Sequence, residues 1–375
     1  MKKLISAAVA SLCLIASAFS APKSPVLKPI DIDVVCEKGE YNDFVVDPRI
    51  EIIAIACRLA EMQGFTNVYG SGDELIGQTV TLYEKYKTHK AVNTIKTLIQ
   101  KGIPNDAMIS LAYHIKPDFS GTIIDFSPFP ETLHYDWKKI PVRTIYTLIS
   151  QLHDFAVESN FQRIYTMNRS TYLLDIGYMK ENVEKYQFAQ WAGDFFKDEE
   201  IQHPVITMSR LCCSYSYYDF AKGADGKRLS YLTTHSGVNL FTVAMCYMDF
   251  YTQLYACRNW EIVKENFIKY DRAYAEKKAT DKKAVEKNYK TPGDYDFSIF
   301  LSSLLFGLYL KSNGTEAGLS YEEFIGGLEK SLAEPNLMKI FPLLEEYSAD
   351  REKYPTFQDF APRLNEFINA LTVSE

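Results

Sequence analysis

The 375-residue chain lacks the short motifs by which several large enzyme classes are recognised. It has no GxxxxGKS/T loop and no GxGxxG loop after a strand, so neither common cradle for nucleotide phosphates is present. It has no GxSxG nucleophile elbow, which argues against an α/β-hydrolase serine. It also has no HExxH, the spacing that places two zinc ligands and a general base on one helical face.

The chain also has few histidines and a net negative charge. Only six histidines are present, and none has another histidine within helical reach, so the sequence shows no preassembled metal site. The 41 lysines and arginines are outnumbered by 48 aspartates and glutamates, which gives a net charge of −7 at pH 7. We therefore expect no nucleic-acid partner of the kind that is held by bulk charge.

Beyond its first residues the chain has no long uninterrupted apolar run. Its composition, 47% hydrophobic and 24% charged, is that of a folded soluble protein. The longest later apolar stretch, residues 297–310, contains serines and predicts a buried helix rather than a membrane span.

Residues 1–20 have the organisation of a secretory signal peptide. Two lysines precede an apolar stretch that ends near Phe19, and small residues stand at positions −3 and −1 before a cut after Ser20. The short, lysine-led start is typical of a bacterial export signal. We therefore expect cleavage after Ser20 and a secreted or periplasmic mature protein without a transmembrane segment.

Cysteine is infrequent, and no pair has the CxxC spacing of thiol-redox and zinc-ribbon sites. An even number in an exported protein permits disulfides, but a chain of this size does not need them to fold. We expect structural roles for the six cysteines that remain after signal cleavage. They are Cys36, Cys57, Cys212, Cys213, Cys246 and Cys257.

Helical periodicity dominates the rest of the sequence. Asp47 and Pro48 predict a helix start, and the apolar residues that follow share one face. A second amphipathic helix is predicted from Ala91 until Gly102 stops it, and a third begins at Pro104. Further helices are predicted over residues 139–157, 182–197, 239–263, 296–311, 320–332 and 357–372. Capping-box spacing supports two of these starts, Ser320 with Glu323 and Thr356 with Asp359.

Strand signals are few. They cover residues 30–35, 205–218 and 228–233, and the glycine-containing turn at 223–226 predicts that the last two form a hairpin. The expected fold class is therefore mainly α (α+β), with a small β-sheet or hairpin. We expect an extended segment over residues 21–44, followed by one mostly helical domain over residues 45–375.

Residues 264–295 are the one shift in composition, because lysines and arginines are concentrated there. A basic stripe can contact a polyanion, but a charged surface helix or linker is the simpler interpretation.

One carboxylate lies in an otherwise apolar stretch. Asp249 follows residues 241–248, which predict a buried helix, and it shares a stripe with Cys246, Gln253 and Cys257. A buried carboxylate must be paired, neutralised or bound to a metal, because its desolvation alone costs several kcal/mol. The alternative is that Asp249 meets water or a lysine where the helix reaches the surface.

His235 stands at the end of the predicted hairpin. One interpretation is a functional role there, in which Cys246 and His235 form a nucleophile–base pair if the fold brings the two together. A structural role is the alternative for both residues.

Several segments together resemble a large uncharacterised family of exported bacterial proteins. They are residues 47–60, 86–91, 102–112, 152–161, 205–208 and 351–362. Typical members carry HExxH on a mid-chain helix and a glutamate further downstream, which is similar to the gluzincin metallopeptidases. The resemblance implies a zincin-like, mostly helical domain over residues 45–375. In typical members the two histidines and the distal glutamate would hold zinc, and the HExxH glutamate would activate water.

This chain departs from the family pattern at the metal site itself. The motif position falls at residues 245–250, where both histidines and the glutamate are missing, and the downstream acidic position falls near Asp296. A shifted alignment onto residues 235–239 keeps His235 but still lacks the base. Without these groups, zinc affinity collapses and water attack slows by orders of magnitude. We therefore expect no zinc cofactor and no metal-ligand residues here.

Three hypotheses follow. The first is a zincin-like protein that has lost metallopeptidase activity and binds a peptide or another cell-envelope component in a groove. The groove would be lined by tyrosines, namely Tyr215, Tyr217, Tyr218, Tyr247 and Tyr251.

The second hypothesis is a hydrolase with a rewired site. Its candidate catalytic residues are Cys246, Asp249, His235 and Asp296. The third is a structural module that binds a partner protein through an apolar patch.

Overall fold

The structure is a computed structural model, whose described residues are 22–66, 74–197, 203–212, 217–222, 228–235, 244, 248, 294–313, 320–331 and 338–370. The backbone divides into two compact units. Unit 1 comprises Met1–Cys36, Val45–Leu174 and Thr207–Tyr231, and unit 2 comprises Glu37–Phe44, Asp175–Ile206 and Leu232–Glu375. The expectation of one domain over residues 45–375 stays a prediction.

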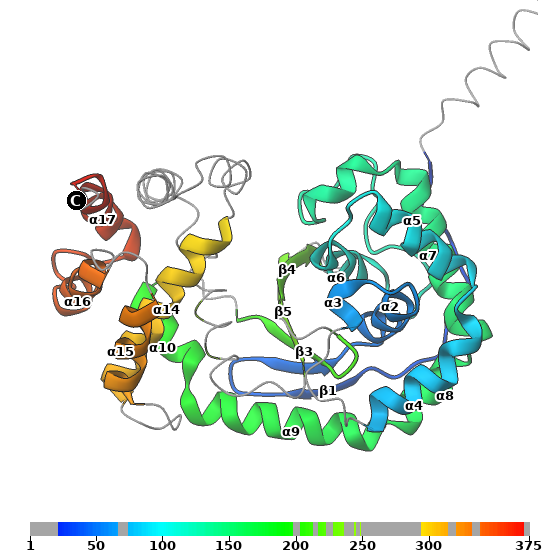
Figure 1. Cartoon of the computed structure of the whole chain (residues 1–375), viewed down its shortest axis with the longest axis horizontal. Coiled ribbons are helices and arrows are strands. Elements are labelled where there is room, and N and C mark those ends of the chain that lie inside the picture. The colour runs from blue at the N-terminus through cyan, green and yellow to red at the C-terminus, as the bar shows by residue number, and fades with distance from the viewer. Residues whose placement is uncertain are drawn as a thin grey trace, which may run out of the picture. The chain divides into compact units, whose positions relative to one another are not determined.

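Unit 1 is built mainly from short helices (Figure 1). They are α2 (Pro48–Leu59), α3 (Gln63–Thr66), α4 (Glu74–Tyr83), α5 (Lys90–Gln100), α6 (Asn105–His114), α7 (Val142–Glu158) and α8 (Phe161–Met167), with 3-10 turns η1 (Glu84–Tyr86) and η2 (Tyr135–Lys139). Helix α9 (Arg169–Tyr186) begins in unit 1 and ends in unit 2. The predicted helix starts at Pro48, near Ala91 and at Pro104 are confirmed to within a residue.

Helix α2 forms the centre of unit 1, and it packs against α5, α6 and α7 (Figure 1). The Asp47 side chain caps it by accepting a hydrogen bond from the Arg49 amide at 2.8 Å, and Pro48 occupies its first turn. Every residue of α2 except Arg58 is buried. The sequence predicts an apolar face for this helix, but the structure buries the opposite face as well.

The full burial of α2 takes two charged side chains out of water. Arg49 pairs with Asp47, with 2.9 Å between Nε and Oδ1, and it donates from Nη1 to the Ile115 carbonyl at 2.8 Å. The guanidinium also lies 5.7 Å from the centroid of the Tyr113 ring. These contacts supply the hydrogen bonds that a buried cation requires.

The second buried charge on α2 is Glu51, which is fully buried. Its carboxylate accepts hydrogen bonds from the Ser209 hydroxyl and, at 3.3 Å, from the Tyr172 hydroxyl. The Ser209 oxygen in turn accepts from the backbone amides of Leu211 and Cys212, at 3.1 and 2.9 Å. Glu51 therefore ties α2 to α9 and to the end of a strand.

The sheet has five strands in the order β1-β2-β3-β5-β4. They are β1 (Val35–Lys38), β2 (Asp43–Val46), β3 (Val205–Ser209), β4 (Tyr217–Lys222) and β5 (Arg228–His235). The pairing of β4 with β5 is what the predicted hairpin requires. The single strand predicted over 205–218 is wrong, because the chain turns after β3, where Ser209 bonds the following amides.

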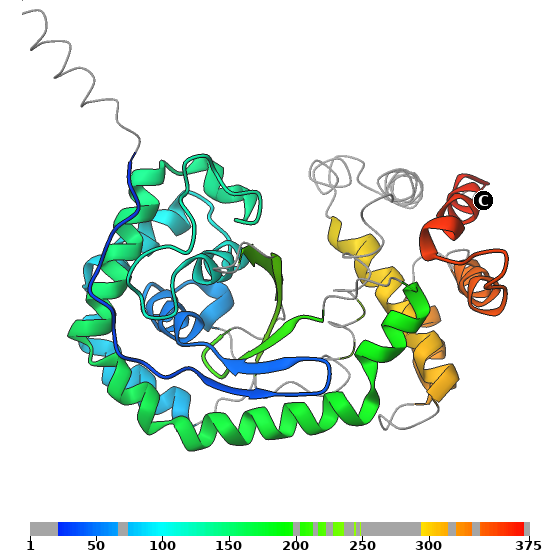
Figure 2. The ribbon, with the colours of Figure 1, turned by 180° about the vertical axis from the view of Figure 1, so that it is seen from behind.

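The predicted strand over residues 30–35 is also wrong, since β1 begins only at Val35. Residues 22–34 are extended and run over the outside of the unit 1 helices (Figure 2). Their backbone bonds a loop instead of the sheet: Leu27 N donates to Ser120 O and Ile30 N to Asp118 O, both at 2.9 Å. The His153 ring on α7 also lies 2.9 Å from the Lys28 carbonyl.

Unit 2 contains α10 (Phe188–Phe196), α14 (Asp294–Asn313), α15 (Tyr321–Ser331), α16 (Ile340–Ala349) and α17 (Phe357–Ala370). The helix predicted over 182–197 is broken at Gln187, whose left-handed φ of 46° separates α9 from α10. Both predicted capping boxes are confirmed, by hydrogen bonds between Ser320 and Glu323 and between Thr356 and Asp359.

The apolar stretch at residues 297–310 lies in α14, and residues 301–310 are all buried, as predicted. None of the helices in the described part of the chain is long and apolar enough to cross a bilayer. Of the predicted helix 239–263, the described residues Ala244 and Met248 are helical and buried. The rest of that helix, residues 264–293 and the turn at 223–226 lie outside the described residues. The fold class is mainly α with a small sheet, as the sequence predicts.

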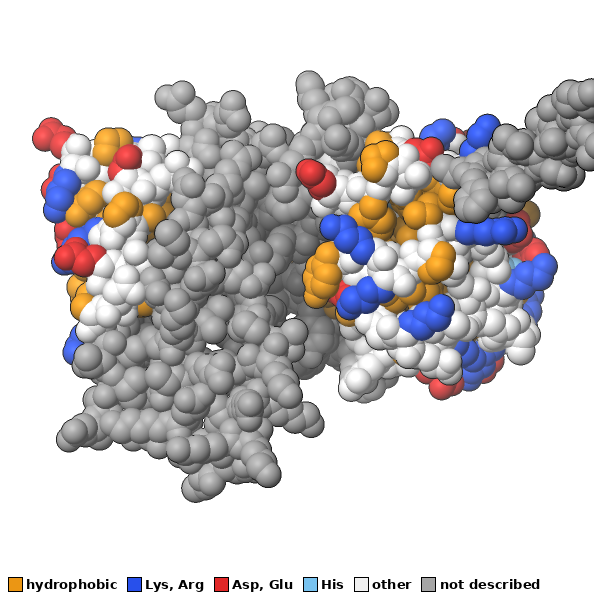
Figure 3. All heavy atoms as spheres, turned by 90° about the horizontal axis from the view of Figure 1, so that it is seen from above, with side chains coloured by type: hydrophobic (Ala, Val, Ile, Leu, Met, Phe, Trp, Pro, Cys, Tyr) orange, Lys and Arg blue, Asp and Glu red, His pale blue; other side chains and the backbone are white. Residues whose placement is uncertain are grey.

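Exposed apolar side chains on unit 1 are interspersed with lysine and arginine (Figure 3). The most exposed large ones on its helices are Met167 and Leu174, at 71% and 73%. Scattered single residues of this kind are normal on a protein surface and indicate no binding site by themselves.

A buried histidine in unit 1 predicts how stability depends on pH. His114 is 1% exposed, its Nδ1 lies 2.9 Å from the Ser110 carbonyl, and its Nε2 lies 2.9 Å from the Thr132 hydroxyl. Burial lowers the pKa of His114 from 6.5 to about 4, the bond to Ser110 opposes this, and the charge of Arg49 adds to it. Between these two values the unfolded chain binds a proton that the folded chain does not.

Stability therefore falls as the pH drops from 6.5 towards 4. For the change from pH 7 to pH 5 this group contributes a loss of about 2 kcal/mol. Urea unfolding at the two pH values should show this loss in the wild type, and a smaller loss in His114→Gln, which cannot titrate. Equal losses in the two proteins would contradict the assignment.

Candidate functional site

The structure describes few of the residues that the sequence singles out. Cys246, Asp249, Tyr215, Tyr247 and Tyr251 lie outside the described residues. Two others have a described backbone only: Asp296 lies in the first turn of α14, and Tyr218 lies in β4. Cys213 and Cys257 also lie outside the described part of the chain.

Two of the predicted site residues have described side chains. His235 ends β5 and is 5% exposed, and Tyr217 begins β4 and is half-buried. Cys57 and Cys212 are buried, while Cys36 is exposed. Within the described ranges, no group of three or more His, Cys, Asp or Glu side chains could hold a metal ion.

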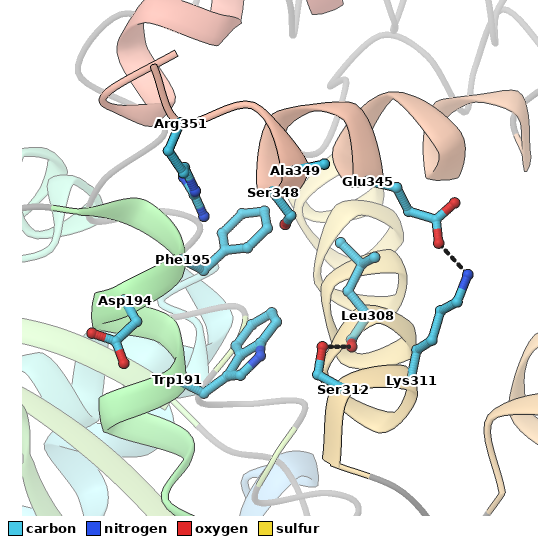
Figure 4. A pocket seen from close by; sticks show the side chains of 10 residues that line it. All are labelled: Trp191, Asp194, Phe195, Leu308, Lys311, Ser312, Glu345, Ser348, Ala349 and Arg351. Carbon is cyan, nitrogen blue, oxygen red and sulfur yellow. Dashed lines mark hydrogen bonds and ion pairs between the residues drawn. The ribbon is translucent and has the colours of Figure 1, made fainter. Parts of the chain in front are cut away.

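Unit 2 contains a surface pocket of about 440 Å³, formed by α10, α14, α16 and the turn that follows α16 (Figure 4). All of its residues belong to this unit. The lining residues are Trp191, Asp194, Phe195, Leu308, Lys311, Ser312, Glu345, Ser348, Ala349 and Arg351.

One wall of the pocket is aromatic. Trp191 and Phe195 lie one turn apart on α10, and their rings stack with centroids 5.2 Å apart and planes 16° apart. Leu308 on α14 faces these rings across the pocket (Figure 4). Phe195 is 4% exposed and also packs edge-on against Tyr347, so the wall continues into the core of the unit.

Two tyrosine hydroxyls fix the helices around the pocket. Tyr347 on α16 donates to the Phe195 carbonyl on α10 at 2.7 Å. Tyr309 on α14 donates to the Tyr186 carbonyl at 2.8 Å, and its ring lies edge-on to Trp191 with centroids 5.7 Å apart. Burial raises the pKa of Tyr347 to about 12, so the phenol stays a neutral donor at neutral pH.

Charged side chains lie at both ends of the pocket (Figure 4). At one end Lys311 forms an ion pair with Glu345, and its ammonium also lies 5.5 Å from the Tyr321 ring centroid. At the other end are Asp194, which is exposed, and Arg351.

Arg351 is held by aromatic rings rather than by a carboxylate. Its guanidinium carbon lies 3.9 Å from the Tyr347 ring centroid and 5.5 Å from that of Phe195. Its Nη1 atom is buried and has no hydrogen-bond partner among the described residues. The described carboxylates likewise form no ion pair with it. Such an arrangement leaves a donor of a charged group unsatisfied.

The pocket has the size and chemistry of a small-molecule or peptide site. Its volume lies in the range of roughly 300–1,000 Å³ that is typical of ligand pockets. An apolar, aromatic wall with charged groups at both ends of the pocket suits an elongated ligand with an apolar body and a charged end. The described side chains of the pocket can bind a ligand and orient it.

Comparison with known proteins gives no relative: no family model, no curated protein and no solved structure matches this chain.

The sequence does not single out this pocket. Trp191 and Phe195 at i and i+4 predict a shared helix face, but such a pair more often packs in a core. The sequence draws attention to Arg351 only as one residue of the segment 351–362, which contributes to the family resemblance. Its contact with Tyr347 is local, since the two residues lie four positions apart in the chain. Its contact with Phe195 depends on the packing of α16 against α10.

The hydroxyl of Tyr347 provides a test of how the pocket is held. Tyr347→Phe keeps the ring beneath Arg351 but removes the hydroxyl, which donates to the Phe195 carbonyl and also interacts with the Arg351 side chain. The loss of the bond to Phe195 should cost about 1 kcal/mol. The matched control is Tyr321→Phe, since the Tyr321 hydroxyl has no hydrogen bond to another described residue. We expect urea unfolding to detect the loss in the first variant and none in the second. Equal stability of the two variants would show that this hydrogen bond does not contribute to the free energy of unfolding.

Proposed function

We propose that this is an exported, zincin-like binding protein that has lost metallopeptidase activity. Its ligand is a peptide or another component of the cell envelope, and it binds in the pocket of unit 2. The observation that carries the proposal is the pocket itself, in which a stacked aromatic wall lies between two charged ends. The signal-like residues 1–20 and the family resemblance support the export and the fold.

Binding is the function that these side chains support best. A preformed aromatic wall loses little conformational entropy on binding, because Trp191 and Phe195 are already fixed by their neighbours. The pocket is open to solvent at Lys311, Ser312 and Ser348, which are exposed, so a ligand can enter without a rearrangement of the helices.

Loss of metallopeptidase activity follows from the departure at residues 245–250, where the family position has neither histidine nor glutamate. The competing function is a hydrolase that uses Cys246, Asp249, His235 and Asp296. A structural module without a small-molecule site is the third function that the sequence leaves open, and a pocket of this size favours a ligand over it.

Filling the pocket should abolish ligand binding. The probe is N-phenyl-1-naphthylamine, a neutral fluorophore whose emission rises when its rings leave water. Ser348 is exposed and lines the pocket, so Ser348→Trp should weaken binding of the probe at least about tenfold without disturbing the core.

The control is Gln190→Trp, which adds the same side chain at an exposed position of α10 outside the pocket lining. It should bind the probe as the wild type does. Saturable binding that survives Ser348→Trp, or no saturable binding by the wild type, would contradict the proposed site.

Metal content separates the proposal from the hydrolase. The purified mature protein should contain no stoichiometric zinc by elemental analysis and should not cleave a mixed peptide library with zinc added. The same measurement on a Cys246→Ala, Asp249→Asn double variant provides the comparison. Stoichiometric zinc and peptide cleavage in the wild type, both lost in the variant, would establish a rewired hydrolase instead.

A further inference from the structure

We infer that Arg351 makes the pocket of unit 2 selective for a carboxylate attached to an aromatic or bulky apolar body. A free aromatic carboxylic acid and the C-terminus of a peptide share this chemistry. The inference rests on the proposed binding function and goes beyond it by naming the class of ligand and the residue that selects it.

The first argument is the unsatisfied donor. Nη1 of Arg351 is buried and lacks a hydrogen-bond partner among the described residues. A buried donor of a charged group that stays unpaired is costly. A small turn of the guanidinium that keeps its contact with the Tyr347 ring and brings this donor to an acceptor is therefore favourable. A ligand carboxylate supplies two acceptors in the geometry that a guanidinium prefers.

The second argument is the way in which the guanidinium is held. Tyr347 covers one of its faces, at 3.9 Å from the ring centroid. The donors of a guanidinium lie in its plane, so stacking occupies the face and leaves the edge for hydrogen bonds. The ring also restricts the side chain before the ligand arrives, which reduces the entropy lost on binding.

The third argument compares the other charged groups of the pocket. Lys311 is already paired with Glu345 and is exposed, so it offers a ligand little beyond what water offers. Asp194 lies at the same end as Arg351 and would repel a carboxylate, but it is exposed and its charge is screened by solvent. Arg351 is half-buried, so solvent screens its attraction for a carboxylate less than it screens the repulsion by Asp194.

The pocket also sets the orientation of such a ligand. With its carboxylate at Arg351, the body of the ligand reaches the stacked wall of Trp191 and Phe195 and the facing side of Leu308 (Figure 4). An aromatic body gains an offset stack against Trp191 in addition to the area it buries.

Two ligands with the same body and opposite charges test the inference. 3-Phenylpropionate and 3-phenylpropylamine are measured against the full mature protein by calorimetry and by displacement of N-phenyl-1-naphthylamine. We expect the carboxylate to bind at least about tenfold more tightly than the amine. Arg351→Gln should remove this preference, whereas Gln190→Trp, at an exposed position outside the pocket lining, should keep it.

Two further variants keep the test decisive if Arg351→Gln fails to fold. Arg351→Lys keeps the charge but not the planar fork, so it should retain only part of the preference. Asp194→Asn removes the repelling charge and should leave carboxylate binding equal or tighter. If Asp194→Asn instead abolishes binding of the amine and the amine is the tighter ligand in the wild type, Asp194 selects a cation and the inference is overturned.

The source of the carboxylate is resolved by a peptide pair. Gly-Gly-Phe with a free C-terminus and its C-terminal amide differ only in the group that Arg351 would bind. Tighter binding of the free acid than of 3-phenylpropionate indicates a peptide C-terminus, whereas tighter binding of 3-phenylpropionate indicates a small aromatic acid. Either result supports the inference if the amide binds weakly.

Failure of the inference and failure of the proposed function give different results. If the fluorophore binds and is excluded by Ser348→Trp, but the acid and the amine bind equally, the pocket is a binding site and Arg351 does not select its ligand. If the wild type binds neither the fluorophore nor any of these compounds, both the proposed function and the inference are wrong.

Discussion

The buried charges of α2 are the constraint on which unit 1 depends. A helix whose residues are all buried except Arg58 can carry Arg49 and Glu51 only if other elements complete their hydrogen bonds. Asp47 and the Ile115 carbonyl do so for Arg49, and Ser209 and Tyr172 do so for Glu51. The packing around α2 is thereby specified by polar geometry as well as by apolar area. Removal of one partner would leave a charge buried without compensation, a change that costs several kcal/mol in general.

A different principle organises the pocket of unit 2. Its wall is formed by stacked and edge-on aromatic rings, and its helices are joined by tyrosine hydroxyls that bond backbone carbonyls. Rings of this kind have few rotatable bonds and hold their positions at little entropic cost. The same rings hold Arg351, so the feature that forms the wall also prepares the charged group at its end.

Local signals account for the elements that the sequence predicts well. Helix starts at Pro48, Ser320 and Thr356 follow from capping chemistry that involves only neighbouring residues. The errors occur where a distant hydrogen-bond partner or an unusual backbone conformation decides the structure. Gln187 breaks a continuous helical pattern through a left-handed backbone, and residues 22–34 bond the loop at 118–120 rather than a strand.

Residue type and short-range spacing were sufficient to predict the fold class and the burial of α14, and they show that the chain has no HExxH motif. The tertiary structure is what buries both faces of α2, since periodicity shows one apolar face and cannot show what covers the other. It alone also decided that Trp191, Leu308 and Arg351 line one pocket. These residues come from three separate segments, and their proximity arises from helix packing, which no local pattern encodes.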